Sequence, residues 1–344
     1  MRSEINDLAH SVRTMTTEVL RLLLSDARHQ ASWSLQFRVN CWRFWISLAR
    51  EKSQFCARVA VALLLSLMIG AIFFRLDRKS GEESGYDQTN VLNVNGALFS
   101  ICVVSGFMQC YMVLTVLPPW IPVLLRDYDR RMYSVGSFYL ALSVVEIPVH
   151  VVLPLLLISI DYWMVGLRRD VGGFLVAAGI VVLSANTAAS FGHLMCTATR
   201  DGASGMIWAG SIMLPLLLVA GFVLNDGSVL TELSWVRYFS WYRHAHELLM
   251  VNQWSDVTTA RCPGVISKGE NKNNSISSSS SSSNSSNGSS QSRCMFSNGT
   301  DVLEQFHFSA ENNLLNYLLL AAMLVMFRAA AFVSLLVRAR RSRV

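Results

Sequence analysis

The alternation of apolar and polar segments predicts six membrane-crossing helices. A hydrocarbon layer of about 30 Å needs roughly 20 helical residues to cross it. Segments of suitable character, some with occasional polar residues, lie at about 56–75, 94–117, 138–166, 173–198, 204–224 and 314–337. The first and the fifth are the clearest, with "CARVAVALLLSLMIGAIFF" and "SGMIWAGSIMLPLLLVAGFVL". Because six is an even number, both ends of the chain should lie on the same side of the membrane.

The third and the sixth crossings each contain a charged residue that calls for an explanation. The third contains Glu146 and two prolines, and it is long enough to bend or to extend beyond the bilayer. Asp161, near its far end, is expected at the outer interface. An ionisable group in lipid is costly and is usually paired or functional, although Glu146 could instead be a solvated residue at the helix end. Arg328 in the sixth crossing raises the same question, the alternative being that it extends to the cytoplasmic headgroups.

An amphipathic helix is predicted before the first crossing, at 31–52. In "ASWSLQFRVNCWRFWISLAREK" the apolar residues recur every three or four positions, as Trp33, Phe37, Cys41, Phe44 and Leu48. Such a helix suits the cytoplasmic headgroup layer. Residues 1–30 are expected to be the remnant of a cytoplasmic linker. Residues 53–344 then form the membrane domain, with a long outer loop at about 226–313.

Basic residues predict the orientation. One set of loops and ends carries thirteen: Arg38, Arg43, Arg50, Lys52, Arg58, Arg126, Arg130, Arg131, Arg200, Arg338, Arg340, Arg341 and Arg343. The opposite short loops carry five: Arg75, Arg78, Lys79, Arg168 and Arg169. Since cytoplasmic loops are enriched in Lys and Arg, both termini should be cytoplasmic.

The long loop before the sixth crossing is expected on the outer or lumenal side. Its Ser/Asn tract cannot build a packed core. Asn-x-Ser/Thr sequons, which could be glycosylated on that side, begin at Asn273, Asn284, Asn287 and Asn298. Cys262 and Cys294 share the loop. In an oxidising compartment they could form an intrachain disulfide, a bridge to a partner, or remain free thiols.

Composition and motifs narrow the function. Of the 344 residues, 52% are hydrophobic and 15% are charged, against about 25% charged in soluble domains. No basic stripe with interleaved aromatics favours nucleic acid. The chain has no phosphate-binding G-x-x-x-x-G-K-[ST] loop, nucleophile elbow or zinc-ligand spacing, so we expect neither an enzyme nor a metal site. His244, His246 and Glu247 lack the i,i+4 spacing of paired helical ligands.

Several stretches resemble the membrane half of G-subfamily ATP-binding cassette (ABC) transporters, particularly the insect White eye-pigment type. They include "QASWSLQFRVNCWRFWISLARE", "IPVLLRDYDRRMYSVGSFYLALSVVEIPV", "ANTAASFGHLM", "AGFVLNDGSV" and "LSWVRYFSWYRHAHELLMVNQWSDV". The resemblance implies an all-α, six-helix type-2 exporter domain with a connecting helix and re-entrant outer-leaflet helices. The aromatic residues Trp235, Tyr238, Trp241, Tyr242 and Trp254 suit the headgroup level in such a re-entrant segment.

The resemblance also implies a function. Members are half-transporters that pair as homodimers or heterodimers and move a small molecule, using ATP and Mg²⁺ bound by a nucleotide-binding domain that is absent from this sequence. White-type substrates are pigment precursors, such as guanine or tryptophan derivatives, moved across the plasma membrane or a pigment-granule membrane. The alternatives are sterol or lipid export and a non-transporting regulatory subunit. The chain is then a truncated gene product or a natural subunit without its own ATPase.

Finally, the resemblance implies roles for particular residues. Coupling to the nucleotide-binding domain would involve the loop residues Arg126, Asp127, Arg130, Arg131 and Tyr133, and an internal polar relay would involve Glu146 and Arg328. The relay carboxylate is expected to have a basic partner from the coupling region. The substrate path is expected to include Phe107, Met108, Met213, Leu214, Leu217, Gly221 and Phe222.

Overall fold

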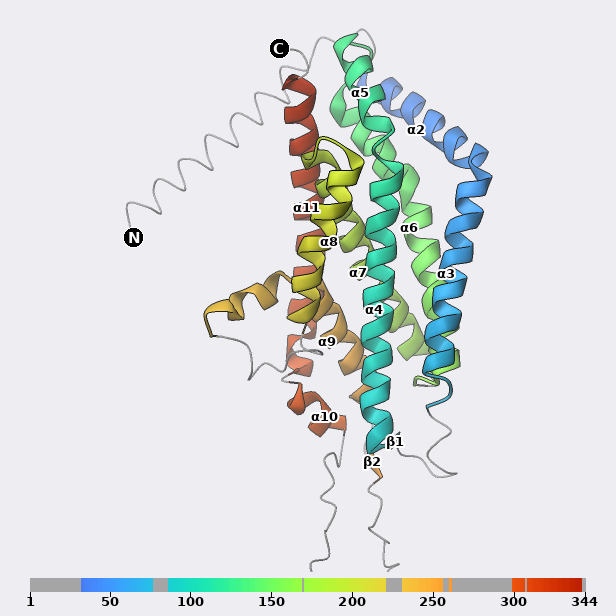
Figure 1. Cartoon of the computed structure of the whole chain (residues 1–344), viewed down its shortest axis with the longest axis vertical. Coiled ribbons are helices and arrows are strands. Elements are labelled where there is room, and N and C mark those ends of the chain that lie inside the picture. The colour runs from blue at the N-terminus through green and yellow to red at the C-terminus, as the bar shows by residue number, and fades with distance from the viewer. Residues whose placement is uncertain are drawn as a thin grey trace, which may run out of the picture.

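Long helices running side by side form most of the molecule (Figure 1). The computed structural model describes residues 32–76, 86–168, 170–220, 231–255, 260–261, 299–306 and 308–341. Its main helices are α2 (Trp33–Arg50), α3 (Lys52–Ile72), α4 (Gln88–Val116), α5 (Trp120–Asp129), α6 (Val135–Val165), α7 (Val171–Ala198), α8 (Gly202–Leu218), α9 (Trp241–Trp254), α10 (Gly299–Gln305) and α11 (Asn313–Arg341). The shorter elements are the 3-10 helices η2 (Thr231–Phe239) and η3 (Ala310–Asn312) and the two-residue strands β1 (Tyr86–Asp87) and β2 (Ala260–Arg261), which pair in parallel.

Five of the six predicted crossings are confirmed as helices of membrane-spanning length. Among the described residues, α3, α4, α6, α7 and α11 are long and apolar enough to cross a bilayer. The helix α8 is apolar but has only 17 residues, and it ends at Leu218, where the backbone N–H of Val219 bonds back to the Pro215 carbonyl. The prediction that this crossing reaches residue 224 was therefore too long for the helix, and residues 221–224 lie outside the described part.

Local sequence sets where these helices begin and end. The side chains of Ser134, Asp170 and Asp201 accept backbone N–H groups at the starts of α6, α7 and α8, as N-cap residues do. The helix α6 ends at Gly166, whose φ of 78° is in the left-handed region that glycine adopts without strain. Each of these three helices therefore begins directly after its capping residue.

The helix α7 lies at the centre of the bundle, in contact with α4, α6, α8, α9 and α11. Small residues let its neighbours approach closely. A Cβ atom added to Gly192 would lie 2.8 Å from the backbone carbonyl oxygen of Cys110 in α4. The helix α3 lies on the outside and packs mainly on α6, where the Ser66 hydroxyl donates to Asp161 (2.9 Å). Asp161 is fully buried there, near the carboxyl end of α6, so the protein shields this ionisable group. Its position at the level of the outer interface stays a prediction.

At Pro154, the second of two prolines within α6, the neighbouring helix supplies a hydrogen-bond donor in place of the missing N–H. Pro154 has no N–H to offer the carbonyl four residues earlier, which belongs to His150. The side chain of Asn186 in α7 donates to that carbonyl at 3.3 Å. This contact links α6 and α7 at the level of the polar cluster described below.

The two ends of the bundle differ. We call one the α5 end, where α2, α5 and the carboxyl end of α11 lie, and the other the α10 end, where α9, α10 and the β1–β2 pair lie (Figure 1). The amphipathic helix α2 and the last turn of α11 share the α5 end (Figure 1).

Candidate functional site

A group of polar contacts fastens the amphipathic helix α2 to α5 and the turn after it. We call it the α2–α5 clasp, formed by Arg43, Asp127 and Tyr133. The Arg43 guanidinium lies 3.3 Å from both the Asp127 carboxylate and the Tyr133 hydroxyl, and that hydroxyl donates to Asp127. The pKa of the Tyr133 phenol is raised, mainly by burial and secondly by the hydrogen bond to Asp127. The hydroxyl therefore stays protonated and remains a donor.

Apolar and polar contacts reinforce the clasp. The Phe44 ring meets Trp120 of α5 and Phe138 of α6 edge to face, each at 5.0 Å. The Gln36 amide oxygen accepts the Ser134 backbone N–H at 2.9 Å and the Ser137 hydroxyl at 3.2 Å, at the start of α6. The amphipathic helix is therefore bound to the elements on either side of the loop at 130–134.

The predicted coupling residues divide into two groups. Asp127 and Tyr133 face α2 within this chain, which the sequence did not predict. Arg126, Arg130 and Arg131 are exposed at the α5 end. These arginines form a basic surface that another protein domain could contact.

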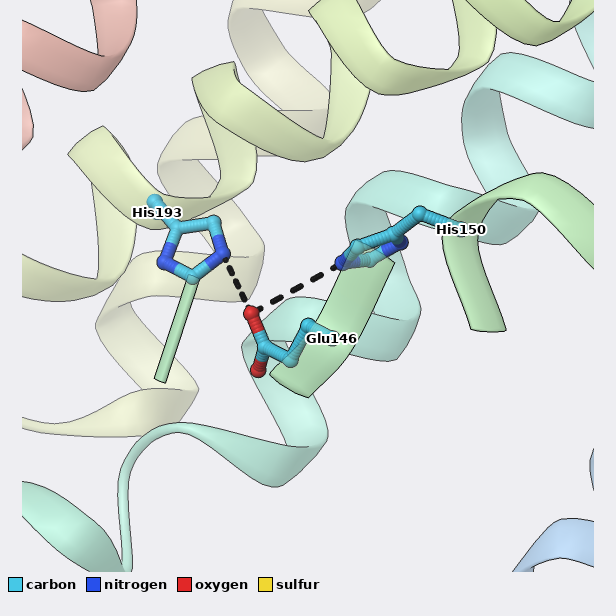
Figure 2. Close-up of side chains that lie close together, drawn as sticks. All are labelled: Glu146, His150 and His193. Carbon is cyan, nitrogen blue, oxygen red and sulfur yellow. Dashed lines mark ion pairs between the residues drawn. The ribbon is translucent and has the colours of Figure 1, made fainter. Parts of the chain in front are cut away.

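A carboxylate and two imidazoles meet inside the bundle (Figure 2). Glu146 Oε2 lies 3.0 Å from Nε2 of His193 in α7 and 3.7 Å from Nε2 of His150, one turn further along α6. Both histidines are almost fully buried. On its other side His150 contacts the Gln109 amide oxygen of α4, at 2.7 Å from Nδ1. The expected basic partner from the coupling region is therefore replaced by histidines of the bundle itself.

Arg328 lies beside this cluster. In the described part of the chain it forms no ion pair with Glu146, but its guanidinium donates to Ser190 (3.0 Å) and Ser143 (3.2 Å). These serines precede His193 and Glu146 by three residues, so Arg328 joins α11 to the helices that carry the cluster. Its side chain is thus held inside the bundle instead of extending to the headgroups.

One part of this cluster had a signal in the sequence. Glu146 and His150 are four residues apart, the spacing that places two side chains on one helix face. His193 is on another helix, and no local pattern could have paired it with them. The sequence predicts no metal site, yet the ligand atoms of Glu146, His150 and His193 all lie within 4.8 Å of one another.

The predicted path residues do not form one surface. Phe107 and Met108 line an apolar cavity of about 480 Å³ between α3, α4 and α6. Its other lining residues are Ala57, Arg58, Val61, Tyr111, Met112, Thr115 and Leu153. On α8, Met213 is fully buried and Leu214 is exposed, and neither they nor Leu217 line the cavity. Gly221 and Phe222 lie outside the described residues.

The helix α9 is almost entirely buried, whereas the preceding residues 235–239 are largely exposed. Trp241, Tyr242 and Trp254 of α9 are at most 1% exposed, because α9 packs against α4, α7 and α11. The Trp254 indole donates to Asn95 of α4 at 2.7 Å. The protein itself covers these three side chains, whereas Trp235 and Tyr238 of η2 are exposed. Their position at headgroup level stays a prediction.

The histidines of α9 fill structural positions. The imidazole of His244 contacts the Asn316 side chain (2.8 Å) and the Tyr238 carbonyl (3.1 Å). His246 lies edge to face against Phe99 and Phe308. The proposed disulfide residues Cys262 and Cys294 and the sequons at Asn273, Asn284, Asn287 and Asn298 lie outside the described residues.

Comparison with known proteins identifies the family. Residues 35–254 match the family described as "ABC-2 type transporter". The chain belongs to the ABC-2 type transporter family. "Protein white" of Drosophila melanogaster is 33% identical over 91% of this chain and 41% of its own length, and "Protein white" of Ceratitis capitata gives the same figures. "Protein scarlet" of Drosophila melanogaster is 26% identical over 90% of this chain and 42% of its own length.

These matches confirm the resemblance to White-type members of the G subfamily and the all-α membrane fold. The matched family is a membrane-spanning, non-catalytic part of ABC transporters. The chain spans about two fifths of the length of these curated relatives, 41% for "Protein white". It is therefore similar to one portion of them, and the activity of the whole relatives is not thereby assigned to it.

Proposed function

We propose that this chain forms the membrane-spanning part of a White-type ABC transporter driven by ATP hydrolysis. The observation that carries the proposal is the 33% identity to "Protein white" across 91% of the chain. ATP and Mg²⁺ would be bound by a nucleotide-binding domain outside these 344 residues, on a partner or on a longer form of the protein. A second half-transporter would complete the complex, as a homodimer or a heterodimer.

The α5 end is the part best suited to receive movement from such a domain. The exposed Arg126, Arg130 and Arg131 would form charge-assisted hydrogen bonds with it. The α2–α5 clasp would make α2 and α5 move together, and the Gln36 contacts would carry that movement into α6. In this proposal the α5 end is cytoplasmic, and the Glu146 and Arg328 networks pass the movement on to α7 and α11.

The substrate class we propose is a pigment precursor, such as a guanine or tryptophan derivative, in a plasma or pigment-granule membrane. Phe107 and Met108 supply apolar contacts of the kind that flat ring systems use. The path would continue along α8, which contacts α4, through Met213, Leu214 and Leu217 to Gly221 and Phe222.

One observation favours a second candidate, the export of a sterol or another lipid. The residues around the 480 Å³ cavity are almost all apolar, with Arg58 and Thr115 as the polar exceptions. A cavity of that character is suited to an aliphatic ring system or an acyl chain with a polar end near Arg58.

Transport by membrane vesicles tests the proposal. The chain would be co-expressed with a White-type partner that has a nucleotide-binding domain, and uptake of labelled guanine, tryptophan and cholesterol would be measured with and without ATP. We expect ATP-dependent uptake of one class, strongly reduced by Arg126→Glu/Arg130→Glu and by Met108→Trp, which fills the cavity. Leu214→Phe changes an exposed position on α8 that does not line the cavity. Reduced uptake in this variant would support α8 as part of the substrate path.

The same experiment also tests whether the chain is a regulatory subunit that does not transport. Stable association with the partner without ATP-dependent uptake of any substrate would contradict transport and support a regulatory subunit. Unchanged uptake in the Arg126→Glu/Arg130→Glu variant would contradict the proposed role of the α5 end.

A further inference from the structure

We propose that Glu146, His150 and His193 bind a divalent transition-metal ion, zinc being the one whose ligand preferences fit best. The site would join α6 to α7 inside the membrane domain. It is a property of the chain beyond the proposed transport function, and neither the family match nor the relatives' names indicate it.

The first argument is the convergence of three buried ligand atoms. Oε2 of Glu146 and Nε2 of both histidines lie within 4.8 Å of one another, with separations of 3.0 and 3.7 Å from the carboxylate. Around a tetrahedral ion with ligand bonds near 2.0–2.2 Å, neighbouring ligand atoms are about 3.3–3.6 Å apart. A metal ion could therefore be accommodated by small side-chain movements.

The second argument is that these atoms have no partner outside their own group. Within the described ranges, Glu146 Oε2 and the Nε2 atoms of His150 and His193 contact one another as ion pairs and have no hydrogen bond to any other residue. Buried polar atoms are nearly always hydrogen-bonded or bound to a metal. Three such atoms facing a common point indicate a shared ligand.

The third argument concerns the proton on His150. The Gln109 amide oxygen, 2.7 Å from Nδ1, is an acceptor, so Nδ1 carries the proton. A neutral His150 ring then presents the lone pair of Nε2 to the Glu146 carboxylate, and two acceptors facing each other repel. A proton on Nε2 of His193 would satisfy only the contact between His193 and Glu146, whereas a metal ion uses all three lone pairs at once. Metal-ligating histidines typically have such a partner on the other ring nitrogen.

The neighbouring groups affect the expected affinity. His193 has no comparable partner at Nδ1 in the described structure, where Tyr139 meets its ring edge to face at 5.9 Å. Arg328, bonded to Ser190 and Ser143, adds positive charge beside the site and should weaken metal binding. Two imidazoles and one carboxylate favour zinc over Mg²⁺ and Ca²⁺, which prefer oxygen ligands, and they leave one position for a water molecule.

Metal analysis of the purified chain tests the proposal. The 344-residue chain would be purified in detergent with a tag that contains no histidine, incubated with ZnCl₂, desalted and analysed for metal content and affinity. We expect about one zinc per chain, and at least a tenfold loss of affinity in Glu146→Gln, His150→Gln and His193→Gln. Gln109→Leu should lower the affinity by about 10–100-fold as an outer-shell change, and Arg328→Met should raise it.

His246→Gln is the matched control, because His246 is equally buried but lies outside the cluster. It should keep wild-type zinc content. The unsubstituted chain provides a second measurement that does not depend on any variant folding: CoCl₂ should produce the visible absorption bands of four-coordinate cobalt, and ZnCl₂ should remove them. Zinc content equal in wild type and His193→Gln, or a cobalt spectrum identical to that of the aqueous ion, would overturn the proposal and leave a carboxylate–imidazolium pair.

Discussion

The α2–α5 clasp predicts an order of interaction energies that can be measured. We consider Asp127→Ala, Tyr133→Phe and Arg43→Gln, singly and in the two pairs that share Asp127. The Tyr133 side chain is largely buried and donates to the Asp127 carboxylate, whereas the Arg43 guanidinium reaches the same carboxylate from a more exposed position. We therefore expect the Tyr133–Asp127 pair to be more strongly coupled than the Arg43–Asp127 pair.

The structure sets the two magnitudes. Tyr133 is 8% exposed, and a buried hydrogen bond to a charged acceptor is worth about 1.5–3 kcal/mol. The Arg43 and Asp127 side chains are 38% and 16% exposed, and an ion pair this hydrated contributes about 0.2–1 kcal/mol. Arg43 also lies 5.5 Å from the Trp120 ring centroid, so part of the effect of Arg43→Gln is independent of Asp127.

The assay is unfolding of the purified chain in mixed micelles with increasing dodecyl sulfate, followed by tryptophan fluorescence. Double-mutant cycles give each pairwise energy. Tyr238→Phe, an exposed tyrosine of η2, is the control and should change the free energy of unfolding by less than about 0.5 kcal/mol. If Tyr133→Phe and Asp127→Ala are additive, or if the Arg43–Asp127 coupling is the larger one, the reasoning from burial is refuted.

Two further predictions concern helix packing. Gly192→Ala should destabilise the bundle by about 1–3 kcal/mol, because the new methyl group meets the Cys110 backbone, which cannot rotate away. Its control is Gly179→Ala, which has no atom within 4 Å of the added Cβ and should be neutral or gain up to about 1 kcal/mol in the same unfolding assay. Equal effects at the two glycines would contradict the packing argument. Trp254→Phe should cost about 1–3 kcal/mol, because it leaves the fully buried Asn95 oxygen without its donor. The exposed Trp235→Phe serves as its control, and a similar loss in both variants would show that the indole hydrogen bond contributes little.

The helices were largely predictable because a bilayer imposes a length on each apolar segment. The boundaries of α3, α6, α7 and α11 differ from the predicted ones by only a few residues, since N-caps such as Ser134 and Asp170 lie just outside the apolar runs. The length of α8 was missed because hydropathy continues past Leu218, where the helix ends. Hydropathy records which residues avoid water and does not record where helical hydrogen bonding stops.

The polar interior was harder to predict because its partners come from different helices. Glu146 stood out as an ionisable residue in an apolar segment, but the approach of His193 depends on how α6 packs against α7. Likewise, the aromatic residues of α9 fit a membrane interface by composition, and only the packing of α9 against α4, α7 and α11 shows that the protein itself covers them. Residue chemistry does not distinguish burial by lipid headgroups from burial by other helices.

The contact between Asn186 and the His150 carbonyl has a consequence for how this domain can change shape. A proline in a long helix normally creates a point of easy bending, because one rung of the hydrogen-bond ladder is missing. Here the side chain of Asn186 in the adjacent helix donates to the carbonyl that Pro154 leaves unpaired, so bending α6 at Pro154 would break a hydrogen bond to α7. A change of shape at this point is therefore coupled to the position of the neighbouring helix.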